Sequence, residues 1–206
     1  MKKTKIFTLT AVSVLAMLLA VGQVQATIAT FDDLPGTGVP IGSYAGFTWS
    51  AYFYQLDGSL PAYQDTGYDH GRVSDNHVAY NSWENFVAVS DGLFDFNGAW
   101  LTGAWNDGLS IQVKGYLGLG LLYDQTVIVN TTGPIWFNFN YLSIDQLEFS
   151  SFGGTPNLEA ARHGEGTHFV MDNFTYTPVP EPSTMLLLGS GLIGLAGYGR
   201  KKFFKK

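Results

Sequence analysis

Two polar pairs near opposite ends of the chain, one of two acids and one of an acid and an amide, carry the hard oxygen ligands that calcium prefers. Asp32 and Asp33 follow a short apolar run near the start, and Asp172 and Asn173 interrupt the last one. In a β-sandwich the first and last strands are often neighbours, which would bring the pairs together. Because Ca²⁺ is bound by several carboxylate, amide and carbonyl oxygens, the sequence predicts a calcium site at Asp32, Asp33, Asp172 and Asn173. The alternative is that the first pair ends a strand and Asp172 lies at a β-bulge.

Aromatic residues form a second candidate site. The chain has five tryptophans, most of which we expect in the core because they bury a large area, but Trp83 is flanked by Ser82, Glu84 and Asn85 and should be exposed. An exposed indole can stack on a sugar ring. We predict a ligand site that consists of Trp83, Tyr63 and Tyr68 as the platform and Asp65, Asp69 and Asn81 as partners for sugar hydroxyls. The alternative is that surface aromatics shield a glycine-rich loop.

The histidines and the known catalytic motifs favour no enzyme. His163, Glu165 and His168 are close in sequence, but their spacing is not that of His-Glu-x-x-His, and His70 and His77 stand alone. The chain has no Cys, and we find neither a Gly-x-Ser-x-Gly elbow nor a P-loop. A pair of carboxylates for glycoside hydrolysis is defined only by its separation in space. We expect a protein without catalytic activity.

The two ends of the chain have the patterns of targeting segments. Lys2, Lys3 and Lys5 precede an apolar stretch from Ile6 to Val21, and Ala26 ends a small-residue cleavage pattern. This predicts a signal peptide over 1–26, with a helical apolar part and cleavage by signal peptidase after Ala26.

The last segment has three parts. Pro180, Glu181 and Pro182 form a rigid polar triplet, Met185–Tyr198 is apolar and uncharged, and Arg200–Lys206 is basic. The apolar part predicts a short transmembrane helix of about 21 Å, against a hydrocarbon thickness of about 30 Å. The basic residues would stay on the cytoplasmic side of the inner membrane, so the segment is a weak and transient anchor.

This three-part tail, residues 178–206, resembles the PEP-CTERM sorting signal. The resemblance implies recognition and cleavage near Pro180-Glu181-Pro182 by an exosortase, an integral membrane enzyme. Together with the signal peptide, it implies export in a Gram-negative bacterium, with a membrane-anchored precursor that is released to the cell surface or the extracellular space.

Removing the terminal segments changes the charge of the rest. Eight of the 11 basic residues lie in those segments, but only Glu181 of the 17 acidic ones does, which leaves 16 acids, 3 bases and a net charge of −13. An acidic domain of this kind argues against nucleic acid as a partner.

Residues 27–177 have the composition of one all-β domain. Short β-rich stretches alternate with Gly, Pro, Asn and Asp turns, and Leu109–Leu117 alternates apolar and polar residues. About ten short strands predict a two-sheet β-sandwich of the jelly-roll type. Long loops are expected over 56–76 and 150–166, and a β-bulge at Asp172-Asn173.

The domain also resembles jelly-roll domains of other PEP-CTERM proteins, which look like carbohydrate-binding modules of the galactose-binding-like type. The similar stretches are Phe31-Asp32-Asp33, Leu109–Leu117 and Phe169–Phe174. The resemblance implies an exported surface or matrix protein that binds or associates with exopolysaccharide. The alternatives are a structural or adhesive matrix protein without a ligand site and a glycan hydrolase.

Overall fold

The computed structural model describes residues 25–180 and 188–195. Residues 26–179 form one compact unit. The expected signal helix, Glu181, Pro182 and the basic end lie outside the described residues, as does part of the expected transmembrane helix. Residues 188–195 are helical. Within the described parts of the chain, no helix has both the length and the apolar character needed to cross a bilayer.

Two long strands organise the domain. β7 (Val87–Gly103) and β11 (Ile135–Phe152) pair antiparallel along most of their length. Their pairing shifts register three times between Asn138 and Gln146, opposite the stretch of β7 from Ser90 to Gly98. On either side of these shifts the strands acquire different neighbours, so each long strand contributes one half to each of two layers.

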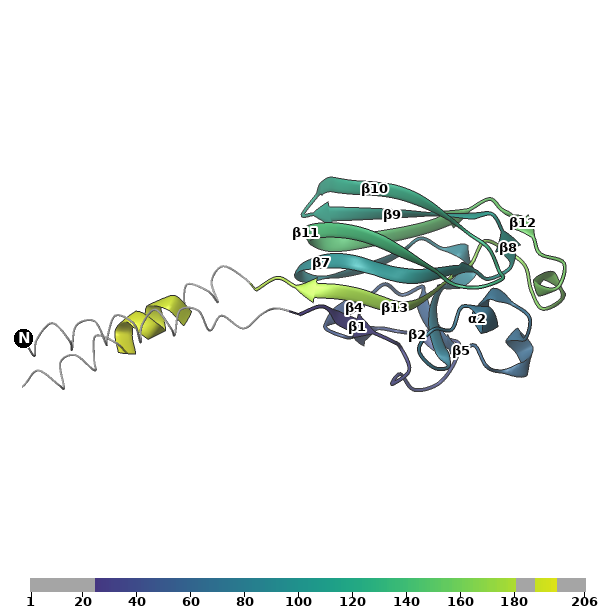
Figure 1. Ribbon diagram of the computed structural model, residues 1–206, viewed down its shortest axis with the longest axis horizontal. Helices are drawn as coiled ribbons and strands as arrows, with labels where there is room; N and C mark the ends of the chain where they lie inside the picture. The colour runs from purple at the N-terminus through teal and green to yellow at the C-terminus, as the bar shows by residue number, and fades with distance from the viewer. Residues whose placement is uncertain (1–24, 181–187, 196–206) are drawn as a thin grey trace, which may run out of the picture. The chain divides into compact units, whose positions relative to one another are not determined.

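The first layer is built on the early half of β7 and the late half of β11. β11 pairs there with β9 (Leu109–Leu117), which pairs with β10 (Gly120–Val129). On the other side, β7 pairs with β4 (Phe47–Trp49), which pairs with β3 (Ser43–Tyr44). β10 therefore forms one edge of this layer (Figure 1).

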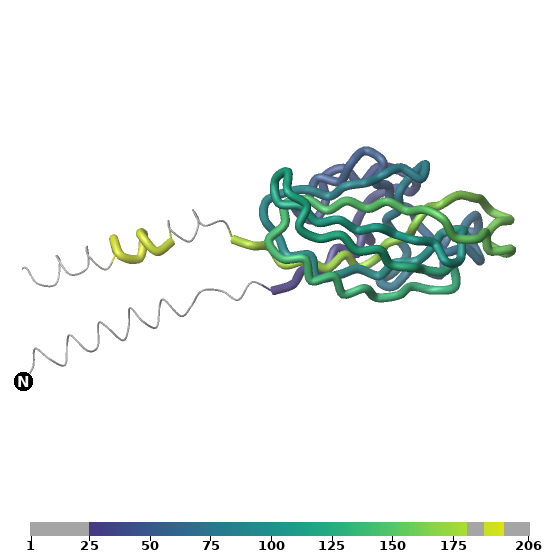
Figure 2. The backbone as a smooth tube through the Cα atoms, turned by 90° about the horizontal axis from the view of Figure 1, so that it is seen from above, coloured from purple at the N-terminus to yellow at the C-terminus, as the bar shows by residue number. Residues whose placement is uncertain are grey.

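The second layer is built on the other two halves. β7 pairs there with β13 (Phe169–Pro178), followed by β6 (His77–Asn81), β5 (Phe53–Asp57) and β2 (Val39–Pro40). β1 (Thr27–Ala29) also pairs with β13, so the first and last strands of the domain are neighbours, as expected. The domain is thus mostly β and sandwich-like, and its two termini leave at the same end (Figures 1 and 2).

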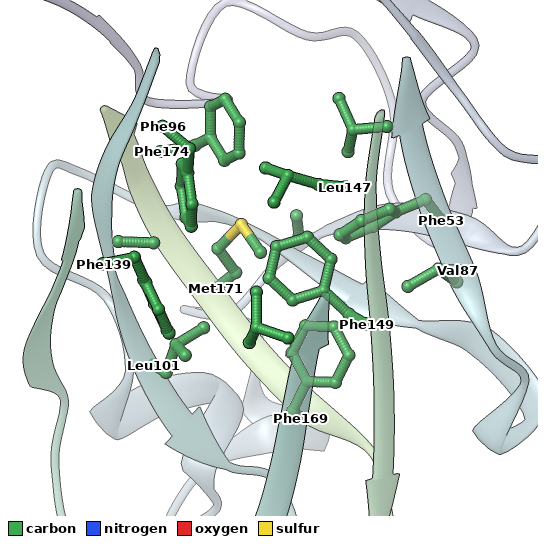
Figure 3. Packing of buried hydrophobic residues seen from close by; sticks show 14 of the residues in the cluster. Phe53, Val87, Phe96, Leu101, Phe139, Leu147, Phe149, Phe169, Met171 and Phe174 are labelled. Atoms are coloured by element: carbon green, nitrogen blue, oxygen red, sulfur yellow. The ribbon is translucent and has the colours of Figure 1, made fainter. Parts of the chain in front are cut away.

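The main core lies between the layers. β9 shows why, because Leu109, Ile111 and Val113 are fully buried while the residues between them are partly exposed. Aromatic rings then meet across the layers: Phe47 and Tyr176 have centroids 4.6 Å apart, and Phe96 and Phe149 have centroids 6.2 Å apart. Figure 3 shows Phe149, Phe169 and Phe174 around Met171 in this core.

A smaller apolar cluster lies apart from this core and organises the region that was expected to be a long loop. Residues 56–76 contain a 3-10 turn, Pro61–Tyr63, and the short helix α2 (Gly67–His70). A turn at Ala160–Arg162 and the two-stranded pair β8 (Asn106–Asp107) and β12 (Thr155–Pro156) complete the region. The buried members of this second cluster are Leu56, Tyr68, Val78, Ala104, Trp105, Ala160 and Val170.

The strand pattern confirms one local prediction. The pairing of β13 with β7 shifts register between Asp172 and Thr175, and Asn173 has a φ of 52°. A β-bulge therefore lies at Asp172-Asn173, where the apolar alternation of the sequence changes phase.

Candidate functional site

Trp83 is the most exposed tryptophan of the domain, with 76% of its surface accessible. It lies in a short turn, Ser82–Glu84, that directly follows β6. Trp83 and Glu84 both have left-handed backbone conformations, with φ of 58° and 57°. Such conformations are unfavourable for residues with a Cβ, at roughly 1–3 kcal/mol each, and persist only where the surroundings enforce them. Contacts with the surrounding residues must therefore hold Trp83 and Glu84 in these conformations.

The side chain of Asn81 anchors the turn to neighbouring strands. Its side chain is fully buried, with Oδ1 accepting from the Phe169 backbone amide at 2.8 Å. Its Nδ2 donates to Ser151 Oγ at 2.9 Å and to the Asn85 carbonyl at 3.3 Å. The amide that the sequence suggested as a sugar ligand therefore has protein partners on both atoms and ties the turn to β11 and β13.

The side chain of Glu84 is positioned by residues 166 and 167. Its Oε2 accepts from Thr167 Oγ1 at 3.1 Å. Its carboxylate lies where a Cβ on Gly166 would be, and Gly166 itself has a φ of 115°. Glycine is favoured at 166 because a φ of 115° is strained for any residue with a Cβ, and such a side chain would also displace the Glu84 carboxylate. The carboxylate is thereby positioned one residue from the exposed indole.

Two further exposed aromatics flank the turn. The Ser82 amide donates to the Tyr52 carbonyl at 2.9 Å, and Tyr52 is 47% exposed. Phe86, two residues after Glu84, is 52% exposed. We call Trp83, Glu84, Tyr52 and Phe86 the aromatic turn site. The sequence prediction did not include Tyr52 or Phe86: Tyr52 lies between Ala51 and Phe53, and Phe86 is followed by the apolar run from Val87.

The tyrosines that were grouped with Trp83 lie in the second apolar cluster. Tyr68 is only 2% exposed, and burial raises its pKa well above 10. Its hydroxyl lies 3.0 Å from Nδ1 of His168, to which Trp105 Nε1 also donates, at 3.1 Å. Tyr63 is half-buried and packs on Tyr68 with centroids 5.2 Å apart. These rings therefore contribute to the packing of the second apolar cluster.

The two acids from the same region are separate again. Asp69 forms a salt bridge with Arg72 at 2.6 Å. Asp65 is exposed and has a φ of 61°. Of the six residues predicted for the ligand site, the structure thus places only Trp83 in the aromatic turn site as an exposed ring.

The residues predicted for calcium hold a backbone segment. Asp172 is fully buried, and its carboxylate accepts from the Val73 and Ser74 amides and from Ser74 Oγ, at 2.6–3.1 Å. Asp32 Oδ1 accepts from the Asn76 and His77 amides, both at 3.0 Å. Burial raises the pKa of Asp172, and the hydrogen bonds from Ser74, Val73 and Asn173 oppose that rise.

The other two members of that set lie nearby. Asp33 Oδ1 accepts from Tyr44 Oη at 2.7 Å. Burial and this hydrogen bond raise the pKa of Tyr44 to about 12. The side-chain oxygen of Asn173 is buried and has no hydrogen-bond partner. Over residues 25–180 and 188–195, no three His, Cys, Asp or Glu side chains are grouped so as to hold a metal ion. Calcium binding stays a prediction.

Comparison with known proteins supports the interpretation of the tail. Residues 178–201 match the family model described as the PEP-CTERM protein-sorting motif. The motif indicates an exported protein that an exosortase processes. No curated protein matches the chain in sequence. A solved structure described as TmCBM61 in complex with β-1,4-galactotriose is similar over 67% of this chain and 92% of its own, with 13% identity and a TM-score of 0.34.

Proposed function

We propose that the exported domain is a non-catalytic glycan-binding module that attaches to exopolysaccharide through the aromatic turn site. The observation that supports this most directly is Trp83, a tryptophan that is 76% exposed on a left-handed backbone. An exposed indole gains nothing from the core, and its backbone costs free energy. A ligand that stacks on the ring accounts for both features.

The chemistry of the site suits a sugar. The flat faces of Trp83, Tyr52 and Phe86 offer apolar surface to the C–H groups of a pyranose ring. Glu84 supplies carboxylate oxygens that accept hydrogen bonds from hydroxyls. The net charge of −13 for residues between the terminal segments favours a neutral or cationic glycan over a strongly anionic one.

The tail defines how the domain reaches its ligand. In this proposal the apolar part of the tail holds the precursor in the inner membrane, and the exosortase then releases the domain near Pro180 to the cell surface or the extracellular matrix. The second candidate function, a structural or adhesive matrix protein, requires no ligand site at all.

The test is binding of the exported protein to exopolysaccharide isolated from its own host, measured by co-sedimentation. Trp83→Ala should weaken the affinity for the glycan by about tenfold, because stacking is lost. Trp136→Ala is the matched control, since Trp136 is also exposed, at 37%, but belongs to β11 and not to the aromatic turn site. No saturable binding by the parent would favour the purely structural function, and equal binding by the parent and both variants would mean that the glycan binds outside the aromatic turn site.

A further inference from the structure

The hairpin that joins β9 to β10 ends in an apolar tip that nothing in the domain covers. Its sequence is Tyr-Leu-Gly-Leu-Gly-Leu-Leu-Tyr, residues 116–123. Leu119 is fully exposed, and Leu117, Leu121 and Leu122 are 45%, 49% and 51% exposed. Leu142 of β11 adds a further side chain that is 54% exposed. We call these five residues the leucine tip.

The leucine tip is held by hydrogen bonds to its surroundings. The Gly118 amide donates to Asp145 Oδ2 at 2.8 Å. The hydroxyl of Tyr123 receives the Leu142 amide at 3.2 Å, and its ring stacks on Tyr141 with centroids 4.5 Å apart. The leucines therefore project from a fixed base. Tyr116 and Tyr123 lie at the two ends of the apolar run.

The chain leaves the domain at this same end. Pro178 of β13 pairs with Phe94, whose other neighbour in the sheet is Ile144 of β11, and the Val179 amide donates to the Leu93 carbonyl at 3.0 Å. Neighbouring strands are about 4.8 Å apart, so Pro178 and Ile144 are roughly 10 Å apart. Figure 1 shows the arrowheads of β9 and β13 at one end of the domain.

The length of chain beyond that exit limits where the domain can be. Eight residues, 180–187, lie between Val179 and the described helical residues 188–195. Even fully extended, they reach at most about 3.6 Å each, or roughly 29 Å. If the tail is in a membrane, the end of the domain that carries the leucine tip stays close to the bilayer surface.

We propose that the leucine tip inserts into the lipid bilayer and orients the domain while the precursor is anchored. This rests on the proposed membrane-anchored precursor. The pattern fits the occupant: leucines favour the acyl region, and tyrosines favour the interface, where an aromatic body and a polar hydroxyl are both accommodated. Two carboxylates are hydrogen-bonded at this end of the domain, Asp145 to the Gly118 amide and Asp95 to the Ser143 amide. Neither would attract anionic lipid, so insertion into a neutral bilayer should depend little on salt.

The absence of cysteine from the chain makes a direct test possible. The full chain with Leu119→Cys is labelled with a fluorophore and reconstituted in phosphatidylcholine vesicles. The label should be quenched by nitroxides on the lipid chains and be several-fold less accessible to aqueous iodide than the same label on Leu158→Cys. Leu158 is 84% exposed in the loop before the Ala160–Arg162 turn. Adding Leu117→Asp and Leu121→Asp should restore iodide access at residue 119.

The outcomes separate the two proposals. Flotation of the vesicles in a density gradient shows whether the chain is bound to them. If the chain floats with the vesicles but iodide reaches both labels equally, insertion of the leucine tip is overturned and the anchored precursor is not. A label at 119 that is shielded from iodide but not quenched by lipid nitroxides means that protein covers the tip, and this also overturns it. A chain that does not float overturns the anchored precursor and, with it, the tip.

Discussion

Asp32 and Asp172, from opposite ends of the domain sequence, accept hydrogen bonds from the backbone amides of one segment, residues 73–77. The Asp172 carboxylate accepts hydrogen bonds from the amides of Val73 and Ser74. The Asp32 carboxylate accepts from the amides of Asn76 and His77. The segment leads from α2 into β6. The two carboxylates therefore fix the entry to the strand that ends at the aromatic turn site.

Asp172→Ala should destabilise the domain by about 3 kcal/mol, because several amides and a hydroxyl lose their acceptor in a buried place. Chemical denaturation measures the change. Asp75→Ala is the matched control: Asp75 is an exposed acid in the same segment, and its loss should change the free energy of unfolding by less than about 0.5 kcal/mol. Similar values for the two variants would contradict a structural role for Asp172.

The stability of the domain should depend on pH through His168. Its Nδ1 accepts from Trp105 Nε1, which can only donate, so the ring is neutral with its proton on Nε2. Burial lowers the pKa of His168 below 6.5, an effect that the nearby carboxylate of Glu84 partly opposes. The unfolded chain thus takes up a proton that the folded chain resists, and stability is full above pH 6.5 and falls below it.

Denaturant unfolding between pH 8 and pH 5 measures this effect, whose slope cannot exceed about 1.4 kcal/mol per pH unit for one proton. His168→Asn should flatten the profile in this range. His163→Asn is the control, because His163 is exposed and its loss should leave the profile unchanged. A profile that keeps its slope in His168→Asn would assign the effect to other groups.

Replacing Trp83 by glycine should separate stability from binding. Glycine adopts a φ of 58° without strain, so Trp83→Gly is expected to raise the free energy of unfolding by about 1 kcal/mol while abolishing exopolysaccharide binding. Trp136→Gly, within β11, should instead lower stability by about 1 kcal/mol. Thermal melting and co-sedimentation report the two properties. A Trp83→Gly domain that is less stable would mean that the indole contributes packing.

The short helix α2 depends on the absence of a side chain at residue 67. A Cβ on Gly67 would overlap the Gly103 carbonyl of β7, and backbone cannot move aside as a flexible side chain can. Gly67→Ala should therefore cost about 3 kcal/mol or more. Gly133→Ala meets nothing within 4 Å and should be nearly neutral. Equal melting temperatures for the two variants would show that α2 can shift without loss.

The calcium prediction from the sequence is tested by melting the protein in calcium and then in EDTA. A bound ion must raise the melting temperature, since it binds only the folded state. On that prediction, Asp33→Asn removes the rise and keeps an acceptor for Tyr44 Oη. If EDTA leaves the melting temperature unchanged, the hydrogen bonds of Asp32 and Asp172 are their whole role.

Much of the architecture follows from local pattern. The alternation of Leu109–Leu117 predicts a half-buried strand, and the phase change at Asp172-Asn173 predicts the bulge that the structure shows. The exposure of Trp83 also follows from its polar neighbours. These features depend on residues close in sequence, which is where pattern carries information.

Other features depend on contacts that pattern does not encode. Short strands were expected throughout, but pairing continues past Asp91-Gly92 and makes β7 a single strand of 17 residues. Residues 56–76 were expected as a loop, yet Tyr68 is buried because Trp105 and His168, distant in sequence, form a pocket for it. Trp136 was expected in the core and instead lies over Gly98, with ring atoms 2.6 Å from where a Cβ would be.

The pairing of β13 with β7 on one side and with β1 and β6 on the other has a mechanical consequence. Any pull on the C-terminal end of the domain acts along β13, parallel to the strand and perpendicular to the hydrogen bonds of its neighbours. Those bonds are then loaded in shear and resist together, whereas a pull across an edge strand such as β10, perpendicular to its length, would open its ladder one bond at a time. A domain tethered at Pro178 is therefore attached through a strand that is hydrogen-bonded on both sides.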